Sequence, residues 1–549
     1  MTRRSGCEGV GWHGRTASSL RKHGFEGEPP PGPGNNARMT DRTESIDLHP
    51  DHRSPVLDRR ELLRAGTLLG ASAALLGLPG VASARRQGLA QTPSLPPGRR
   101  AKNLIFMASD GMSTGTLTLA DMHRRRTLDR PSAWCSLWSR PGVYRGTART
   151  HSLNSLVTDS AAAGSAWGCG VHINNGAINV GPDGTQLMPL LIPAMQAGRK
   201  TGLVTTTRIT HATPAAFIAN VPRRDMEDII AQQMLERRVD VLLGGGDRHF
   251  PAELLAAHPD LRVVRNAGQL ETAAAVPPQG RLLGLFARSH VPYVLDRMPW
   301  VPSLASMSRA ALARLEASPE GFVLQIEGGR IDHAAHSNDA AALVKEQLDF
   351  DDAIAAVLDW LDAGGEAGGG ARARDTLLIV TSDHGNANPG LTIYNQAADK
   401  AMANLDRAAG SFERIEKAME SAGSPEAAVA GLSASVAEVV GRELSDKELE
   451  WVAGPLLGRP AFPFSGLRSW SSALGSVLAD DLGVSFISGN HTADQVEVTA
   501  MGPGSDSVVG CIDNTRLHAV AMNALGLSEG RPLPGMDEKF RSGRAPAND

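Results

Sequence analysis

With 549 residues, the chain is long enough for one large or two ordinary domains with a substantial core. Its content of 42% hydrophobic and 21% charged residues is typical of a soluble globular protein. The net charge of −4 provides no basic field, which argues against a protein that binds nucleic acid by general charge attraction.

The first hundred residues are predicted to precede the folded part. Residues 1–58 are polar and rich in Pro and Gly, which predicts a disordered extension. Residues 59–84 begin with paired arginines and continue with an uncharged run of small and apolar residues, a pattern that resembles a twin-arginine signal peptide. A membrane anchor is the alternative, but the glycines and proline of this run make it too weakly apolar for a stable span. Residues 85–100 then form a linker. We therefore expect export, to the periplasm or outside the cell.

From residue 101 onward, short apolar runs alternate with helix-like segments. The runs cover 102–109, 202–206, 239–243, 322–326, 377–381 and 496–501, with helical segments such as 225–237 and 340–361 between them. This alternation predicts βαβ units and an α/β fold. We expect a three-layer sandwich, in which helices cover both faces of a mostly parallel central sheet. Ligands of such sheets bind beyond the carboxyl ends of the strands, where Asp110, Glu327 and Asp383 stand.

The four cysteines show no CxxC spacing, so neither a zinc ribbon nor a redox motif is indicated. They are Cys7, Cys135, Cys169 and Cys511. A Cys135–Cys169 bridge is compatible with the sequence, which does not establish it.

A helical insertion is predicted to interrupt the main folded domain, which would comprise 101–390 and 466–549. Within 391–465, apolar residues from Met402 to Met419 keep a helical period. Ser424-Pro425 resembles the N-cap and first position of a second helix, and Ser445 with Glu448 forms a capping-box pattern for a third. Because the insertion follows Asp383-His384, we expect it to border the functional site or to form a subunit contact.

Residues 327–336, EGGRIDHAAH, are the strongest local signal of chemistry. An apolar strand ends at Glu327, two glycines allow a tight turn, and Asp332 and His336 follow four residues apart. Positions i and i+4 share one face of a helix, so these two side chains could bind one metal ion while Glu327 serves a second. A strand-to-helix turn with solvated charges would explain one such segment equally well. Three further apolar strands adjoin metal-capable residues, which favours a metal site; these residues are Asp110, Asp383-His384 and His491.

These residues together have the composition of a site for several cations. Four carboxylates at one sheet edge would repel each other without bound cations. Histidines 336, 384 and 491 add the nitrogen ligands that suit zinc, while a carboxylate–hydroxyl site suits magnesium.

Ser160 is the candidate nucleophile. It begins a segment of small, helix-prone residues, and the N-terminus of a helix favours a bound phosphate. An N-cap serine without a catalytic role is the commoner meaning of such a pattern. The metal cluster changes the balance, because a nearby cation could lower the pKa of the hydroxyl.

With these motifs in order, the chain resembles the alkaline phosphatase family over residues 100–390 and 465–525. The motifs are Asp110-Gly-Met, TDSAA at 158–162, TTTRITHATPAA at 205–216, LGGG at 243–246, the segment 327–336, TSDH at 381–384, and His491.

The resemblance implies Ser160 as the nucleophile that becomes phosphorylated, and three metal sites around it. Asp332, His336 and His491 match the ligands of one zinc ion. Asp110, Asp383 and His384 match those of a second zinc ion, which activates Ser160. Asp110, Thr213 and Glu327 match a third site that usually holds magnesium.

The resemblance also implies how phosphate is positioned. Arg224 falls where the family has its phosphate-binding arginine, with Arg223 as the alternative if the alignment shifts by one, and Asp159 would hold this side chain. His211 and His333 stand where some bacterial members have an acid and a lysine.

The sequence therefore predicts an exported enzyme that hydrolyses phosphate monoesters, with two Zn²⁺ and one Mg²⁺. Its partners would be small-molecule phosphomonoesters, without nucleic acid specificity or a stable membrane anchor, and a homodimer is considered. A phosphodiesterase or phosphomutase of the same superfamily is the nearest alternative. Arg224, suited to a dianionic monoester, argues against a diesterase, and the signal peptide argues against a mutase. An inactive phosphate- or metal-binding module is the alternative from another class, which the intact nucleophile and ligands oppose.

Overall fold

The computed structural model describes residues 100–276, 279–363, 370–461, 467–528 and 530. The expected N-terminal extension and signal peptide, and the linker up to residue 99, lie outside the described residues. None of the helices in these ranges combines the length and the apolar character that a membrane span requires.

A ten-stranded sheet with the order β14-β2-β13-β8-β1-β7-β3-β4-β6-β5 forms the centre of the main folded domain. All strands run in one direction except β13, which is antiparallel to both of its neighbours, β8 and β2. The expected mostly parallel sheet is thus confirmed. The strands are β1 Asn103–Ser109, β2 Val143–Arg149, β3 Lys200–Arg208, β4 Val241–Gly245, β5 Leu261–Val264, β6 Arg281–Leu285, β7 Phe322–Gly328, β8 Thr376–Thr381, β13 Val496–Met501 and β14 Gly510–Asp513.

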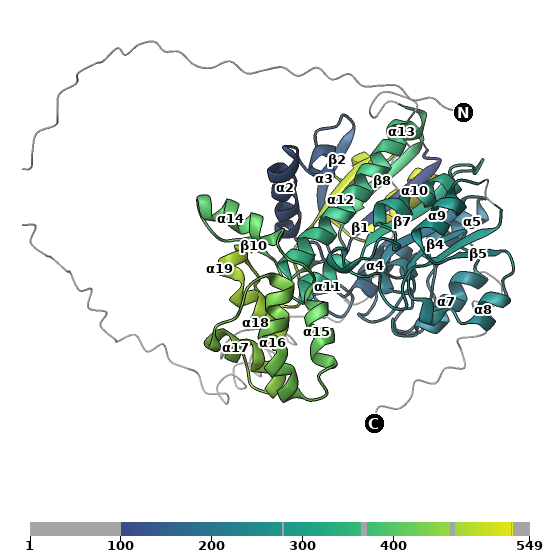
Figure 1. Cartoon of the computed structure of the whole chain (residues 1–549). Coiled ribbons are helices and arrows are strands. Elements are labelled where there is room, and N and C mark those ends of the chain that lie inside the picture. Colours follow the sequence, from purple (N-terminus) through teal and green to yellow (C-terminus); the bar gives the residue numbers. More distant parts are fainter. Residues whose placement is uncertain (1–99, 277–278, 364–369, 462–466, 529, 531–549) are drawn as a thin grey trace, which may run out of the picture. The chain divides into compact units, whose positions relative to one another are not determined.

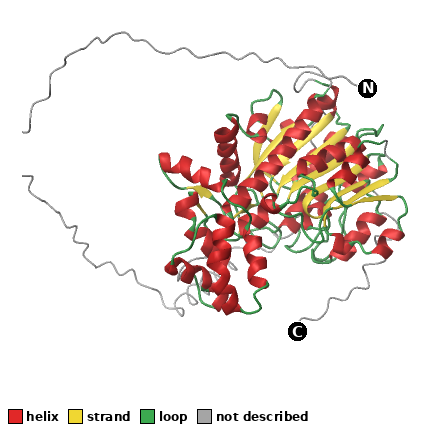
Figure 2. Cartoon of the chain, viewed as in Figure 1, coloured by secondary structure: helices red, strands yellow, loops and turns green. Residues whose placement is uncertain are grey.

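Helices cover both faces of this sheet, as Figures 1 and 2 show. Side chains alternate between the faces, so Leu104 and Phe106 of β1 enter one core while Ile105 and Met107 enter the other. The first face carries α4 Ser160–Cys169, α5 Leu191–Gln196, α6 Ala212–Ala216, α7 Glu227–Glu236 and α20 Arg516–Leu525. The second carries α3 Ala133–Leu137, α9 Ala267–Ala274, α10 Leu304–Leu315, α11 Arg330–His336 and α12 Ala340–Asp362. The three-layer sandwich is therefore confirmed.

The reversed strand β13 explains how His491, late in the sequence, reaches the edge of the sheet where the parallel strands end. Val498 of β13 lies opposite Thr381, the last residue of β8. The amino end of β13 therefore meets the carboxyl ends of the parallel strands. Just before it, the short strand β12 His491–Thr492 pairs with β9 Gly385–Asn386, which follows β8.

The described part of the predicted insertion, residues 391–461, contains four α-helices, not the three expected from its pattern. They are α14 Gln396–Leu405, α15 Phe412–Glu420, α16 Pro425–Val440 and α17 Asp446–Ala453. The apolar period from Met402 to Met419 spans two helices, because Ser411 caps α15 by accepting a hydrogen bond from the backbone N–H of Glu413. Ser424 and the Ser445–Glu448 capping box begin the next two helices as predicted.

A third hydrophobic core holds this insertion against the main folded domain. Leu405, Phe412 and Leu432 pack with Leu119 of α2 Thr114–Leu128 and with Val344 of α12. The remaining helices are α8 Ala252–Ala256, α13 Ala371–Asp375, α18 Trp470–Val477 and α19 Ala479–Leu482, and β10 Gly390–Leu391 pairs with β11 Val484–Ser485.

The three described cysteines are free thiols, so the Cys135–Cys169 bridge does not form. Cys135 lies on α3 and Cys169 ends α4, and these helices pack on opposite faces of the sheet. Burial raises the pKa of Cys135 to about 11 and that of Cys169 to about 12, so both stay protonated at neutral pH.

Candidate active site

Ser160 is the first residue of α4 and is almost fully buried. Asp159 forms the N-cap, because its carboxylate accepts a hydrogen bond from the backbone N–H of Ala162 at 2.9 Å. The small residues of α4 allow close contact with α6: a Cβ on Gly168 would stand 2.0 Å from the carbonyl oxygen of Ala216. The Oγ of Ser160 lies 3.2 Å from Nε2 of His384.

Asp332, His336 and His491 form the first of three groups beside Ser160. The two Nε2 atoms of the histidines are 3.0 Å apart, and each lies 3.4 Å from a carboxylate oxygen of Asp332. Nδ1 of His336 donates to the carbonyl oxygen of Gly489 and Nδ1 of His491 to that of Thr158, both at 2.8 Å. A carbonyl oxygen can only accept, so each Nδ1 carries its proton and the two Nε2 atoms can face each other only with a shared proton or a metal ion between them.

Asp110, Asp383 and His384 form the second group, and all three are fully buried. Nε2 of His384 lies 3.1 Å from Asp383 and 3.7 Å from Asp110. Only glycine fits at position 111, next to Asp110. Gly111 has φ of +68°, and a Cβ there would stand 2.6 Å from Oδ1 of Asp332 in the first group. This is the physical reason for the glycine in the Asp-Gly-Met motif.

Glu327 is the centre of the third group, on β7 between Ala108 of β1 and Thr205 of β3. Asp110, His211 and Glu327 bring one ligand atom each to within 4.8 Å of one another. The sequence placed Thr213 here and His211 beside the phosphate; His211 belongs to this group, and its Nε2 also lies 3.0 Å from Nη2 of Arg224. Several buried polar atoms of these groups have no hydrogen-bond partner within the described chain: both oxygens of Asp110, Oε1 of Glu327, Oγ1 of Thr213, Oδ2 of Asp383 and Nδ1 of His211 and His384. Other atoms of this kind lie elsewhere, but carboxylate oxygens concentrated beside one another in this way fit a bound ion.

The comparisons with known proteins agree with this geometry. The family model described as alkaline phosphatase matches residues 101–412. The chain belongs to the alkaline phosphatase family. It is 37% identical over 320 residues to the repressible alkaline phosphatase of Saccharomyces cerevisiae, which covers 52% of this chain and 55% of that protein. The chain thus spans little more than half of the yeast protein.

Two other relatives match over most of their length. Alkaline phosphatase 4 of Bacillus subtilis is 30% identical over 469 residues, which covers 83% of this chain and 92% of that protein. The crystal structure of Thermus thermophilus alkaline phosphatase has a TM-score of 0.70 at 36% identity and covers 83% of this chain and 97% of that one. Family membership makes the chain an enzyme of the phosphomonoesterase class.

The electrostatics of the site are consistent with bound cations. Burial raises the pKa of Asp110 well above its usual range, and the carboxylates of Asp383, Asp332 and Glu327 add to this effect. Burial also raises the pKa of Glu327 to about 7. Burial alone would lower the pKa of His491, but the adjacent Asp332 carboxylate raises it to about 9. Side chains whose pKa values are shifted in this way by burial and by each other's charges are typical of a metal-binding site. The nitrogen and oxygen donors of the first two groups fit zinc, and the carboxylate and hydroxyl oxygens of the third fit magnesium.

Arg224, not Arg223, faces the site. Its Nη1 donates to Oδ2 of Asp159 at 3.1 Å and its Nη2 lies 3.0 Å from Nε2 of His211. Arg223 is exposed and forms an ion pair with Asp225. The expected contact between Asp159 and the arginine is therefore present.

Residues that the sequence analysis missed surround His333. His290, in the loop after β6, has its ring centroid 4.4 Å from that of His333. Nη1 of Arg330 lies 2.7 Å from Nδ1 of His333, and Nη2 of the same arginine pairs with Glu413 of the insertion helix α15. Burial lowers the pKa of His290 and His333, so both rings are neutral. A single histidine in a loop produces no local sequence pattern, and neither does an ion pair between two residues that are 83 positions apart.

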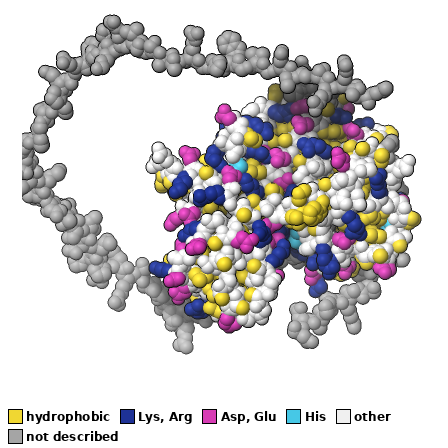
Figure 3. Space-filling view, in the orientation of Figure 1, with side chains coloured by type: hydrophobic (Ala, Val, Ile, Leu, Met, Phe, Trp, Pro, Cys, Tyr) yellow, Lys and Arg dark blue, Asp and Glu magenta, His cyan; other side chains and the backbone are white. Residues whose placement is uncertain are grey.

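Figure 3 shows histidine side chains in a surface hollow close to α11, with acidic and basic side chains interspersed over the surrounding face.

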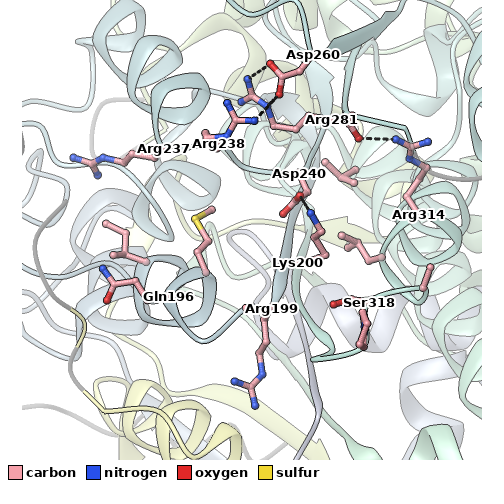
Figure 4. Close-up of a pocket in the computed structure, with 18 residues that line it drawn as sticks. Gln196, Arg199, Lys200, Arg237, Arg238, Asp240, Asp260, Arg281, Arg314 and Ser318 are labelled. Atoms are coloured by element: carbon pink, nitrogen blue, oxygen red, sulfur yellow. Dashed lines mark hydrogen bonds and ion pairs between the residues drawn. The ribbon is translucent and has the colours of Figure 1, made fainter. Parts of the chain in front are cut away.

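A separate cavity of about 750 Å³ is drawn in Figure 4. Its lining includes Lys200 and Arg281, the first residues of β3 and β6, so it lies at the amino edge of the sheet, away from Ser160. Lys200 pairs there with Asp240, and Arg281 pairs with Asp260.

Proposed function

We propose that the chain hydrolyses phosphate monoesters to an alcohol and inorganic phosphate through a phosphoserine intermediate on Ser160. The observation that carries this proposal is the pair of Nε2 atoms of His336 and His491, 3.0 Å apart with both Nδ1 atoms committed to carbonyl oxygens. Such a pair, beside a buried serine at a helix N-terminus, suits a metal-assisted attack on phosphorus.

We propose that two zinc ions and one magnesium ion occupy the three groups. Asp332, His336 and His491 would hold the first zinc ion, and Asp110, Asp383 and His384 the second. Asp110, Thr213 and Glu327 would hold magnesium, with the unpartnered oxygens of Thr213 and Glu327 in support. When bound, these cations would lower the pKa of the Ser160 hydroxyl and neutralise charge on the phosphate and on the departing oxygen.

The chain's own residues supply positioning. Oγ of Ser160 forms the new bond to phosphorus while the ester P–O bond breaks and the alcohol leaves with a proton. Water then cleaves the Oγ–P bond and releases phosphate. Arg224, held by Asp159 and next to His211, would bind two phosphate oxygens through its planar guanidinium group. His333, whose Nδ1 lies 2.7 Å from Nη1 of Arg330, would lie on the same side of the bound phosphate.

We further propose that the enzyme is exported through the signal at 59–84 and acts on small phosphomonoesters. We also propose that the insertion borders the site. The ion pair between Arg330 and Glu413 supports this role, because Arg330 contacts His333 directly.

Ser160→Ala tests the proposal. It removes the phosphate acceptor, so acid-quenched protein should carry no phosphoserine and turnover of an aryl phosphate monoester should fall by about 10³-fold or more. Ser165→Ala is the matched control, since this serine lies on the same helix and its hydroxyl bonds to the carbonyl oxygen of Ala161. Turnover of an aryl diester and metal content are measured on the same samples. A label on another residue, or faster turnover of the diester than of the monoester, would contradict the proposal.

A further inference from the structure

A fourth group of metal-capable side chains lies outside the candidate active site. It consists of His151, His172 and Asp513, whose ligand atoms lie within 4.8 Å of one another. His151 stands two residues after β2, His172 follows α4, and Asp513 ends β14. Three segments far apart in the sequence thus place two imidazoles and one carboxylate together. All three residues are half-buried, so solvent and ions can reach them.

The geometry of this group is already compact. Nε2 of His172 lies 2.8 Å from Oδ1 of Asp513, and the ring centroids of His151 and His172 are 4.2 Å apart with the planes inclined at 34°. Oδ1 of Asp513 also accepts hydrogen bonds from the backbone N–H and the hydroxyl of Thr515, at 3.2 and 2.7 Å. These bonds hold the carboxylate in place, as outer contacts do for a metal ligand.

We propose that His151, His172 and Asp513 bind a further zinc ion, with water in the fourth position. Two nitrogen donors and one oxygen donor match the preference of zinc, and a tetrahedral ion separates its ligands by roughly 3.4 Å, which requires only small side-chain movements here. An ion pair of His172 with Asp513 would explain one contact but not the position of the second imidazole, that of His151, whose plane is inclined at 34° to the first. Burial and the neighbouring His172 lower the pKa of His151, which keeps this ring in the neutral form that binds metal.

Through the loop after α4, a bound ion would connect the fourth group to the side chains that are proposed to bind phosphate. The loop after α4 that carries His172 continues to Asn175 and Gly176. Oδ1 of Asn175 accepts from the backbone N–H of Asp159 at 3.1 Å, and the backbone N–H of Gly176 donates to the Asp159 carboxylate at 3.0 Å. The carbonyl oxygen of Gly176 accepts from the backbone N–H of Arg224 at 2.7 Å. Zinc at the fourth group would therefore stabilise the loop that positions Asp159 and Arg224. Binding of the ion itself does not depend on the proposed catalytic function.

Zinc stoichiometry of the full chain tests the site. Wild-type protein, His151→Gln and His172→Gln are loaded with zinc, desalted and analysed by mass spectrometry for metal content. Each variant should hold about one zinc ion fewer per chain than wild type, because only two ligands remain. His258→Gln is the matched control: this half-buried histidine is near Asp260, but Arg281 and Arg238 already pair with that carboxylate. Equal zinc content in all four proteins, or an equal loss in the control, would overturn the proposal.

A second measurement remains valid if a histidine variant folds poorly. Asp513→Asn keeps an oxygen acceptor for Thr515 while removing the charged ligand. With zinc present, its melting temperature should lie several degrees below that of wild type, and the gap should largely close once both proteins are stripped by a chelator. Anomalous diffraction from wild-type crystals at the zinc edge should show a peak between the three side chains. A gap that persists unchanged after stripping, or the absence of that peak, would refute the site.

Discussion

Asp339 joins the catalytic part to the insertion, and its titration offers a quantitative test of that contact. One carboxylate oxygen caps α12 by accepting from the backbone N–H of Ala342 at 3.0 Å, and the other accepts from the backbone N–H of Phe412, the first residue of α15, at 2.7 Å. The side chain is 2% exposed. Burial raises its pKa from 3.8 to about 6, although both backbone bonds oppose this change.

The sign of the pH dependence follows from proton binding. Between pH 3.8 and about 6, the folded protein holds a proton on Asp339 that the unfolded chain has already released. Folding is therefore favoured by this group below pH 3.8, and the contribution is lost as the pH rises to about 6. A shift of about two units corresponds to about 3 kcal/mol of unfolding free energy at most. Asn cannot titrate. Between pH 4 and pH 7, the free energy of unfolding of Asp339→Asn should therefore rise relative to that of wild type by up to this amount.

Urea unfolding of both proteins at half-unit steps from pH 4 to pH 7 measures this difference. Effects of pH on the metal sites are shared by the two proteins and cancel in the comparison. Asp121→Asn is a useful control because Arg125 and Ser132 outweigh the effect of burial and lower the pKa of Asp121. Because the lowered pKa places this titration below pH 3.8, the difference in unfolding free energy between Asp121→Asn and wild type should stay nearly constant from about pH 5 to pH 7. A difference between Asp339→Asn and wild type that stays constant over this range would refute the reasoning.

His491→Ala should lower the zinc content by about one ion per chain, since the first group keeps only two ligands; unchanged content would rule this histidine out as a ligand. Arg224→Ala should raise KM for a monoester and the inhibition constant of phosphate by about tenfold, with a smaller loss of kcat. Arg223→Ala, at an exposed position, should leave both unchanged, and the reverse pattern would show that the wrong arginine was chosen. Glu413→Gln should reduce kcat/KM by about fivefold at constant metal content, because Arg330 loses its ion pair; wild-type kinetics would exclude an influence of the insertion on the site.

Local sequence was sufficient for the main features of the catalytic part. Apolar runs alternating with helices indicated a parallel sheet, and the rule that ligands bind at the carboxyl ends of its strands brought Asp110, Glu327 and Asp383 to one edge. The four-residue spacing of Asp332 and His336 was enough to place both side chains on one face of α11. These inferences succeed because they depend on spacing along a single element or on a property shared by all parallel sheets.

Tertiary structure alone decided which distant residues complete these groups. His491 reaches Asp332 because β13 runs against its neighbours and β12 pairs with β9, and no pattern near His491 encodes that direction. The contact of Glu413 with Arg330 and the gathering of His151, His172 and Asp513 likewise depend on how separate elements are ordered in space. Contacts of this kind are set by strand order and by the packing of helices on the sheet, which short stretches of sequence do not specify.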